Sequence, residues 1–270
     1  MPLPILQSSN VHGSADLVRL FHHTELQWAR HLSEETPLEA GVAFVNPELP
    51  RVWDANRVLD AAAPAGSTPE ELVAEAESFF AERGTPCAQW TMNPSAPPDR
   101  TAPLIRSLES SGWRADPADI FYLPGRPPAP IREAAGLTII PARASFRHWR
   151  ELAEEWARCR AEPQLADAAM LHLDDPHYDA MLALRDGKVA GRAGVLAVGD
   201  VGRIDQVYVA EAFRRQGVGR TLMSRALEIC ARSLFRHVML SMNPASDAAR
   251  ALYEGIGFQT IGQIVSYRRT

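Results

Sequence analysis

The sequence predicts an α/β protein in which two related halves follow one another along the chain. Strand-like and helix-like stretches alternate from residue 137 to residue 270. Within them, a β-branched strand runs directly into a glycine turn that opens a helix, over residues 203–220. Short motifs of this second half recur in the same order in the first half. The repetition indicates a duplicated unit.

Length and composition limit the classes of protein that the chain can form. Its 270 residues exceed one average domain, so two domains are expected. A net charge of −5 argues against nucleic acid as a partner. The sequence has no apolar stretch long enough to span a membrane, and its three distant cysteines suit a reducing compartment. We therefore expect a cytoplasmic enzyme with no nucleic-acid or membrane partner, as a monomer or homodimer.

The expected elements follow from periodicity and from turn residues. Alternating or β-branched runs indicate strands, and apolar residues at three- and four-residue steps indicate helices. A proline-rich stretch, residues 124–136, predicts an extended linker between domains at 1–123 and 137–270. In order, we expect strands at 43–45 and 58–59, a helix at 69–83, a strand at 137–140, helices at 145–162 and 164–171, strands at 178–185 and 189–198, the strand and helix of 203–236, a strand at 238–242, a helix at 247–254 and two closing strands.

The glycine turn carries the strongest functional signal. A strand that feeds a glycine turn at a helix N-terminus leaves several backbone N–H groups free, and such a group of donors binds phosphates. Gly217 and Gly219 would let a diphosphate approach the backbone closely. Positive charge around it would come from Arg214, Arg215 and Arg220. The turn therefore predicts a site for a small anionic ligand.

The pattern Arg214-x-x-Gly217-x-Gly219 resembles the acyl-CoA signature of the GNAT superfamily of N-acetyltransferases. Asn243-Pro244 after an apolar strand, and residues 249–258, which are similar to the family's A-x-x-x-Y-x-x-x-G-F segment, follow in the family's order. The resemblance covers residues 137–270 closely and the first half in outline. It implies two tandem acyl-CoA N-acyltransferase (GNAT) folds, each a mixed twisted sheet flanked by helices.

The resemblance also implies acetyl-CoA as cosubstrate and no metal. Main-chain groups of the strand before the turn would pair with the pantetheine arm, and the turn would hold the phosphates. The implied cofactor-binding residues are Val207, Tyr208, Val209, Arg214, Arg215, Gln216, Gly217, Val218, Gly219, Arg220, Thr221 and Asn243.

Tyr253 matches the family tyrosine and is the candidate general acid for the departing thiolate. A phenol titrates near about 10 and an alkyl thiol near about 8.5, so proton donation is feasible when it is coupled to bond breaking. The alternative is that Tyr253 only packs beside Phe258 on the helix face.

Asp205 is the candidate general base, because it lies two residues before Val207 on the same strand. Strict alternation would place Asp205 on the same face as Val207 and Val209. The alternative is a half-exposed acid bonded to Arg203 or Arg192.

The first half contains a second copy of these motifs that has diverged in sequence. Residues 92–96 echo residues 242–246, and residues 108–113 echo residues 253–258. Leu108 stands where the second half has its tyrosine, and Thr68-x-x-Glu71 is a capping-box pattern that would close the corresponding helix N-terminus. We therefore expect a degenerate, non-catalytic first domain that binds no CoA.

Taken with the resemblance, the sequence predicts an N-acetyltransferase. It would move an acetyl group from acetyl-CoA to a primary amine of a small molecule or peptide, by direct attack in a ternary complex. A mycothiol-synthase-like acetyltransferase and a non-catalytic acetyl-CoA-binding sensor are the alternatives.

Overall fold

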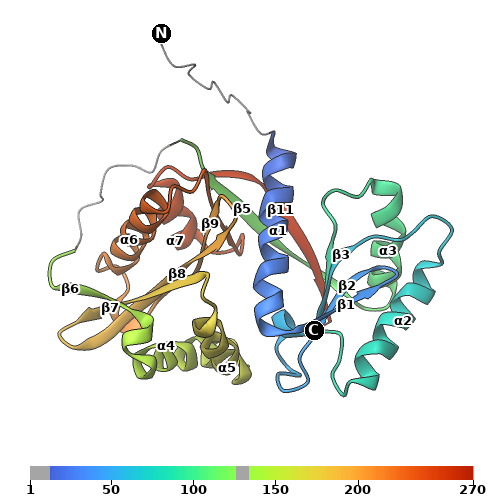
Figure 1. Ribbon diagram of the computed structural model, residues 1–270, viewed down its shortest axis with the longest axis horizontal. Coiled ribbons are helices and arrows are strands. Elements are labelled where there is room, and N and C mark those ends of the chain that lie inside the picture. Colours follow the sequence, from blue (N-terminus) through green and yellow to red (C-terminus); the bar gives the residue numbers. More distant parts are fainter. Residues whose placement is uncertain (1–12, 126–133, 270) are drawn as a thin grey trace, which may run out of the picture.

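The computed structural model describes residues 13–125 and 134–269, which form two lobes joined by one sheet (Figure 1). Helix α1 lies between the lobes. The first half of the chain comprises α1 (Ser14–Leu32), β1 (Glu34–Leu38), β2 (Gly41–Val45), the 3-10 helix η1 (Trp53–Ala55), β3 (Arg57–Ala61), α2 (Pro69–Glu82), β4 (Gln89–Met92), α3 (Pro98–Ser110) and β5 (Arg114–Leu123).

The second half supplies the larger lobe. Its elements are β6 (Leu137–Pro141), η2 (Ala142–Ala144), α4 (Phe146–Cys159), α5 (Gln164–Leu171), η3 (His172–Asp174), β7 (Tyr178–Arg185), β8 (Lys188–Val198), β9 (Val201–Val209), η4 (Glu211–Phe213), α6 (Val218–Arg232), β10 (His237–Met242), α7 (Asp247–Glu254) and β11 (Gln259–Arg268).

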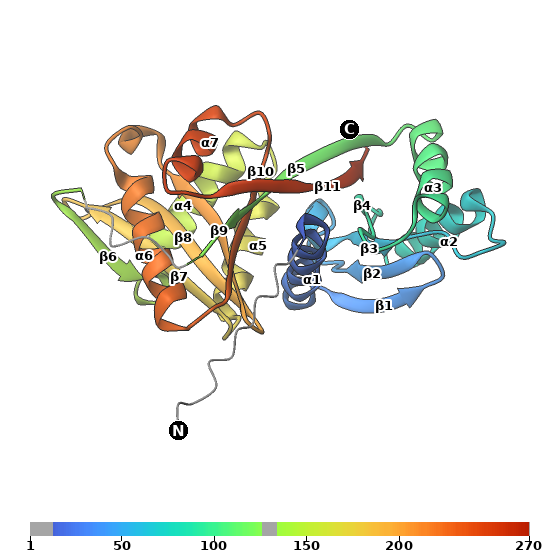
Figure 2. The same cartoon turned by 90° about the horizontal axis from the view of Figure 1, so that it is seen from above.

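The two halves exchange their last strands. The strand order of the sheet is β1-β2-β3-β4-β11-β5-β10-β9-β8-β7-β6. Strand β5 of the first half therefore pairs with β10, and β11 of the second half pairs with β4. Strands β5 and β11 also pair with each other, antiparallel, and Figure 2 shows them running from one lobe to the other.

The exchange also reaches the hydrophobic cores. Phe121 and Leu123 of β5 are buried in the core that α6 and α7 cover. Tyr267 of β11 is buried in the core of the first lobe, with α2 and α3. Each lobe is therefore completed by a strand from the other half of the chain.

The ends of β4 and β10 carry the same turn, as the predicted repeat requires. In each turn the side-chain oxygen of an asparagine accepts the amide of the second residue after it, at 2.7 Å for Asn93 and 2.9 Å for Asn243. The backbone oxygen of each asparagine accepts the amide of the third residue after it. This turn is built by the asparagine itself and so recurs with the sequence.

The helices that follow, α3 and α7, also end alike. The amide of Trp113 donates to the oxygen of Leu108 at 3.0 Å, and the amide of Phe258 donates to the oxygen of Tyr253 at 3.1 Å. In both cases the preceding glycine has a positive φ. Strands β5 and β11 start from these matched ends. Together with the matched element order, this confirms the predicted tandem fold.

The expected elements of the second half agree with the structure within a few residues, apart from its last strands. The two closing strands are one strand, β11, with a register shift between Thr260 and Gly262. Cys159 is exposed, whereas Cys230 is buried. Helix α1 is not among the elements that the sequence pattern predicted. None of the helices in residues 13–125 and 134–269 combines the length and the hydrophobicity that a membrane-spanning helix needs.

The domain boundaries stay a prediction. Most of the expected linker, residues 126–133, lies outside the described residues. The exchanged strands mean that the lobes do not correspond simply to residues 1–123 and 137–270.

Candidate active site

The turn before α6 has the geometry that an anion requires. Gly217 is the N-cap of α6 and has a left-handed conformation. Because glycine has no side chain that could accept a hydrogen bond, the helix N-terminus has no side-chain cap. The first amide of this end to bond is that of Thr221, which donates to the oxygen of Gly217 at 3.0 Å. The amides of residues 218–220 contact no acceptor in the described parts of the chain, so they stay available to a ligand.

Three exposed arginines surround this turn. Arg215 and Arg220 form no ion pair within the described residues, and Arg214 donates only a long bond to the oxygen of Val209, at 3.4 Å. The left-handed φ of 62° at Arg215 belongs to the turn itself. The turn therefore offers positive charge as well as backbone donors, as the sequence predicted.

The neighbouring parallel strands β9 and β10 separate next to this turn. They pair only where residues 201–203 meet residues 237–239, and both continue beyond that point unpaired with each other. An extended chain could pair with the edge of β9 that is left open there.

The alternation expected along β9 does not hold, because the strand contains a bulge. Gln206 has a left-handed φ of 51°, and the register against β8 shifts at this point. Val207 and Val209 pack on the α6 side of the sheet together with Ile204. Asp205 is consequently on the opposite face from Val207, since an extra residue reverses the alternation after it.

The corresponding strands of the first half, β3 and β4, stay paired with each other where β9 and β10 separate. Asp60 has the same left-handed bulge as Gln206, but Ala61 still pairs with Met92 of β4, and its oxygen accepts the amide of Asn93 at 3.0 Å. The side chain and the oxygen of Arg100 both bond to Ala63 beyond this point.

The predicted capping box is not formed. Thr68 is the N-cap of α2, but it makes no side-chain hydrogen bond there. The first half therefore differs from the second through backbone pairing between β3 and β4, and the explanation based on Thr68 and Glu71 is wrong.

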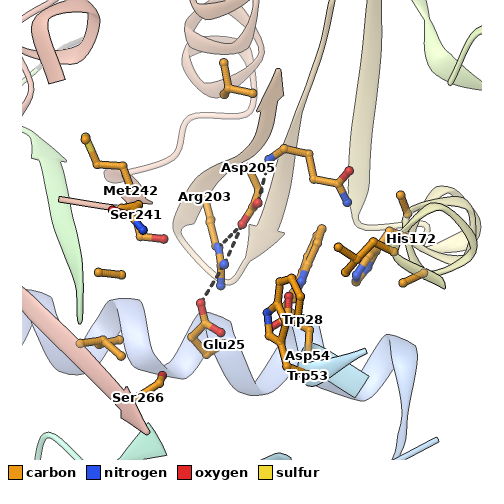
Figure 3. Close-up of a pocket in the computed structure, with 18 of the residues that line it drawn as sticks. Glu25, Trp28, Trp53, Asp54, His172, Arg203, Asp205, Ser241, Met242 and Ser266 are labelled. Carbon is orange, nitrogen blue, oxygen red and sulfur yellow. Dashed lines mark hydrogen bonds and ion pairs between the residues drawn. The ribbon is translucent and has the colours of Figure 1, made fainter. Parts of the chain in front are cut away.

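A cavity of about 430 Å³ lies between the lobes and brings several predicted residues together (Figure 3). Tyr253, Asp205 and Asn243 line it, as do residues 207 and 208. The arginine and glycine residues of the turn before α6, which we call the phosphate turn, do not line the cavity. The first half contributes one wall of the cavity, including Glu25 and Trp28 of α1 and Trp53, Asp54 and Arg57.

Tyr253 is buried, with 6% of its surface exposed, and its ring contacts Phe121 and Phe258 edge-on at centroid distances of 6.0 and 6.2 Å. Burial raises the pKa of Tyr253, and the charge of Asp205 raises it further. The phenol is therefore protonated over the physiological range. Its hydroxyl makes no hydrogen bond to any described residue.

Asp205 forms an ion pair with Arg203, as the alternative interpretation of this residue predicted. Its Oδ2 accepts from Nη2 and Nε of Arg203 at 2.6 and 2.8 Å, and its Oδ1 accepts the amide of Gln206 at 2.7 Å. Its side chain remains 24% exposed toward the cavity.

Glu25 of α1 joins this ion pair to the first half of the chain. Its two oxygens pair with Arg203 at 2.8 Å and with Arg57 at 3.0 Å. Burial acts to raise the pKa of Glu25, but the charges of Arg203 and Arg57 outweigh it and lower the pKa to about 2. Arg57 also pairs with Asp54 at 3.3 Å. This network holds β9 against the first lobe.

We expect Glu25→Gln to lower the free energy of unfolding by about 3–5 kcal/mol, because it leaves two buried guanidinium groups without their shared charge. Glu25 has a lowered pKa in the folded state, so its contribution is present above about pH 4.5 and is lost as the pH falls toward 2. Urea denaturation across this pH range measures both effects.

Glu35→Gln is the matched control for this experiment. Glu35 pairs with Arg30 on the surface, and such pairs contribute at most about 1 kcal/mol. Equal losses for the two variants would contradict the assigned role of Glu25.

The chain is thus a tandem α/β protein in which a glycine turn at the start of α6 lies beside two parallel strands that separate. Residues 144–258 match the model of the acetyltransferase (GNAT) family.

One curated relative is the N-alpha-acetyltransferase RimI of Mycobacterium tuberculosis, which is 30% identical over 101 residues. The match covers 36% of this chain and 62% of that protein, so the chain matches less than two thirds of its length.

Two solved structures show the same tandem fold. A GCN5-related N-acetyltransferase from Kribbella flavida has a TM-score of 0.67 and 19% identity, over 93% of this chain and 95% of that one. A tandem GNAT protein from the clavulanic acid biosynthesis pathway has a TM-score of 0.57 and 17% identity, over 78% and 74% of the two chains.

Proposed function

We propose that this protein is an N-acetyltransferase that moves the acetyl group of acetyl-CoA to a primary amine of a small molecule or peptide. The observation that carries the proposal is that β9 takes part in two features: its edge belongs to a candidate acyl-CoA site, and one of its faces lines the cavity. Its open edge and the phosphate turn suit an acyl-CoA, and its other face contributes Asp205 to the cavity that Tyr253 also lines. The name of the mycobacterial relative, an N-alpha-acetyltransferase, is consistent with an amine acceptor.

In this proposal the reaction is a direct attack within a ternary complex. The lone pair of the amine forms a bond to the thioester carbonyl carbon, and the carbon–sulfur bond breaks. Tyr253 gives its proton to the departing thiolate, and Asp205 takes the proton that the attacking nitrogen loses, through water. Main-chain groups of residues 207–209 on the open edge of β9 would hold the pantetheine arm, and residues 214–221 would hold the phosphates.

The direct test is acetyl-CoA consumption with a panel of amino acids, peptides, polyamines, aminoglycosides and sugar amines. Acetylation of a cysteinyl sugar amine alone would favour the mycothiol-synthase-like alternative. Tight acetyl-CoA binding without turnover on any amine would favour the sensor and contradict the proposal.

Gly217→Glu is expected to weaken acetyl-CoA binding by at least ~100-fold, because a carboxylate would occupy the diphosphate position at the helix N-terminus. Calorimetry on the wild type should give one site per chain. Gly66→Glu is the matched control, since Gly66 also has a positive φ and precedes α2 in the closed first half. Two sites per chain, or equal losses in both variants, would show that the first half also binds.

A further inference from the structure

Arg192 of β8 is a buried cation without an anion. Only 2% of its surface is exposed, and it lines the cavity between the lobes. Its Nε and Nη1 are buried and have no hydrogen-bond partner among residues 13–125 and 134–269. Leaving charged donors of this kind unsatisfied is costly, so a native structure normally gives them a partner.

The other arginines buried in this cavity wall do have carboxylate partners. Arg57 and Arg203 share Glu25, and the half-buried Arg268 pairs with Asp116 at 2.9 Å. Within the described chain, Arg192 forms no ion pair. It lies 4.9 Å from the ring centroid of Trp149 and 5.8 Å from that of Trp156.

The two indole rings offset part of the cost of burying this charge, but they supply no hydrogen-bond acceptor in the plane of the guanidinium group. Burial lowers the pKa of Arg192 to about 10, so the side chain remains a cation at neutral pH. A planar guanidinium group whose donors are unsatisfied is suited to a bidentate bond with a carboxylate.

We propose that Arg192 binds a carboxylate of the acceptor, and that the acceptor is an amine that also carries a carboxylate, as an amino acid does. This inference rests on the proposed acetyl transfer and names the substrate class of the same cavity.

The strand register places the two ends of such a molecule within one cavity. Arg192 is opposite Tyr208, and Gly194, two residues along β8, is opposite Asp205. Two residues of strand span about 7 Å, so the carboxylate site and the candidate base lie within the reach of one small molecule. A carboxylate at Arg192 would thereby direct the amine toward Asp205 and Tyr253.

The test compares each of the twenty protein amino acids with its carboxamide, which keeps the amine and removes the anionic charge. For the wild type, we expect kcat/KM to be at least ~100-fold higher for the preferred acid than for its amide. Arg192→Met should remove this preference, mainly by raising KM for the acid, and Arg192→Lys should keep part of it. Arg232→Met is the control, since Arg232 is exposed on α6 and pairs with no described residue.

Stability and binding separate this role from a structural one. Replacing an unpaired buried charge with an apolar side chain should leave the Tm of the ligand-free protein unchanged or raise it. A Tm well below that of the wild type for Arg192→Met would overturn the inference by showing an internal role. Equal use of acids and amides by the wild type would also overturn it, while the proposed acetyl transfer would stand.

If no amine is acetylated, the proposed function fails, and calorimetry with the amino acids in the presence of CoA still tests the site. Binding of the acid that Arg192→Met loses by at least ~100-fold, and that the amide does not show, would support the carboxylate site. Equal binding to the wild type and to Arg192→Met would overturn it.

Discussion

Tyr253→Phe is expected to lower turnover by about 10²–10⁴-fold while acetyl-CoA affinity stays nearly unchanged. The ring contacts with Phe121 and Phe258 survive the substitution, and only the hydroxyl proton is lost. At about 1.4 kcal/mol for each tenfold change, the loss corresponds to about 3–5 kcal/mol of transition-state stabilisation. Steady-state kinetics on the preferred amine, together with calorimetry of acetyl-CoA, measures the two quantities separately.

Tyr267→Phe provides the matched control. Tyr267 is another buried tyrosine, and its ring packs in the core of the first lobe, away from the cavity. Removal of the Tyr267 hydroxyl group should leave kcat unchanged. Full activity of Tyr253→Phe would make the tyrosine a packing residue and would move the acid role to water.

The second large effect concerns the exchanged strands. A chain of residues 134–270 alone is expected not to fold into a stable monomer, although it contains the whole segment that matches the family. Without β5 it would expose the pairing edges of β10 and β11 and would lose Phe121 and Leu123 from its core. Each of these side chains contributes about 1.5–3 kcal/mol when buried, which is a large part of the stability of a domain.

Co-expression of residues 1–125 with residues 134–270 tests the same idea in the opposite direction. The two fragments should associate, because each carries the strand that completes the other's sheet. Circular dichroism and size-exclusion chromatography measure folding and association. A stable, monomeric C-terminal fragment would show that the two lobes are independent domains.

Local sequence patterns were enough to predict most of the second half. Glycine at position 217, the arginines around it and the strand before it act within a few residues of one another. Their spacing in the sequence therefore predicts the local backbone conformation directly. The repeat could be read for the same reason, since the turn at Asn93 and Asn243 and the helix ends before Trp113 and Phe258 are built from neighbouring residues.

Other features depend on contacts between residues far apart in the chain. The bulge at Gln206 occurs at a residue that is not glycine, so its left-handed backbone leaves no mark in the sequence, and the predicted alternation failed there. The pattern at Thr68 and Glu71 suggested a capping box, whereas the first half is closed by the pairing of Ala61 with Met92.

The elements of the second half, the glycine turn before α6, the repeat and the candidate acid Tyr253 could all be predicted from the sequence alone. The exchange of β5 and β11 between the halves is visible only in the folded chain, because the apolar pattern of a strand specifies the face it buries and not the neighbour with which it pairs. That exchange brings the two lobes together around one cavity. The same packing places Glu25 between two arginines and leaves Arg192 without a carboxylate partner among the described residues, since the partners of a buried charge depend on the whole fold.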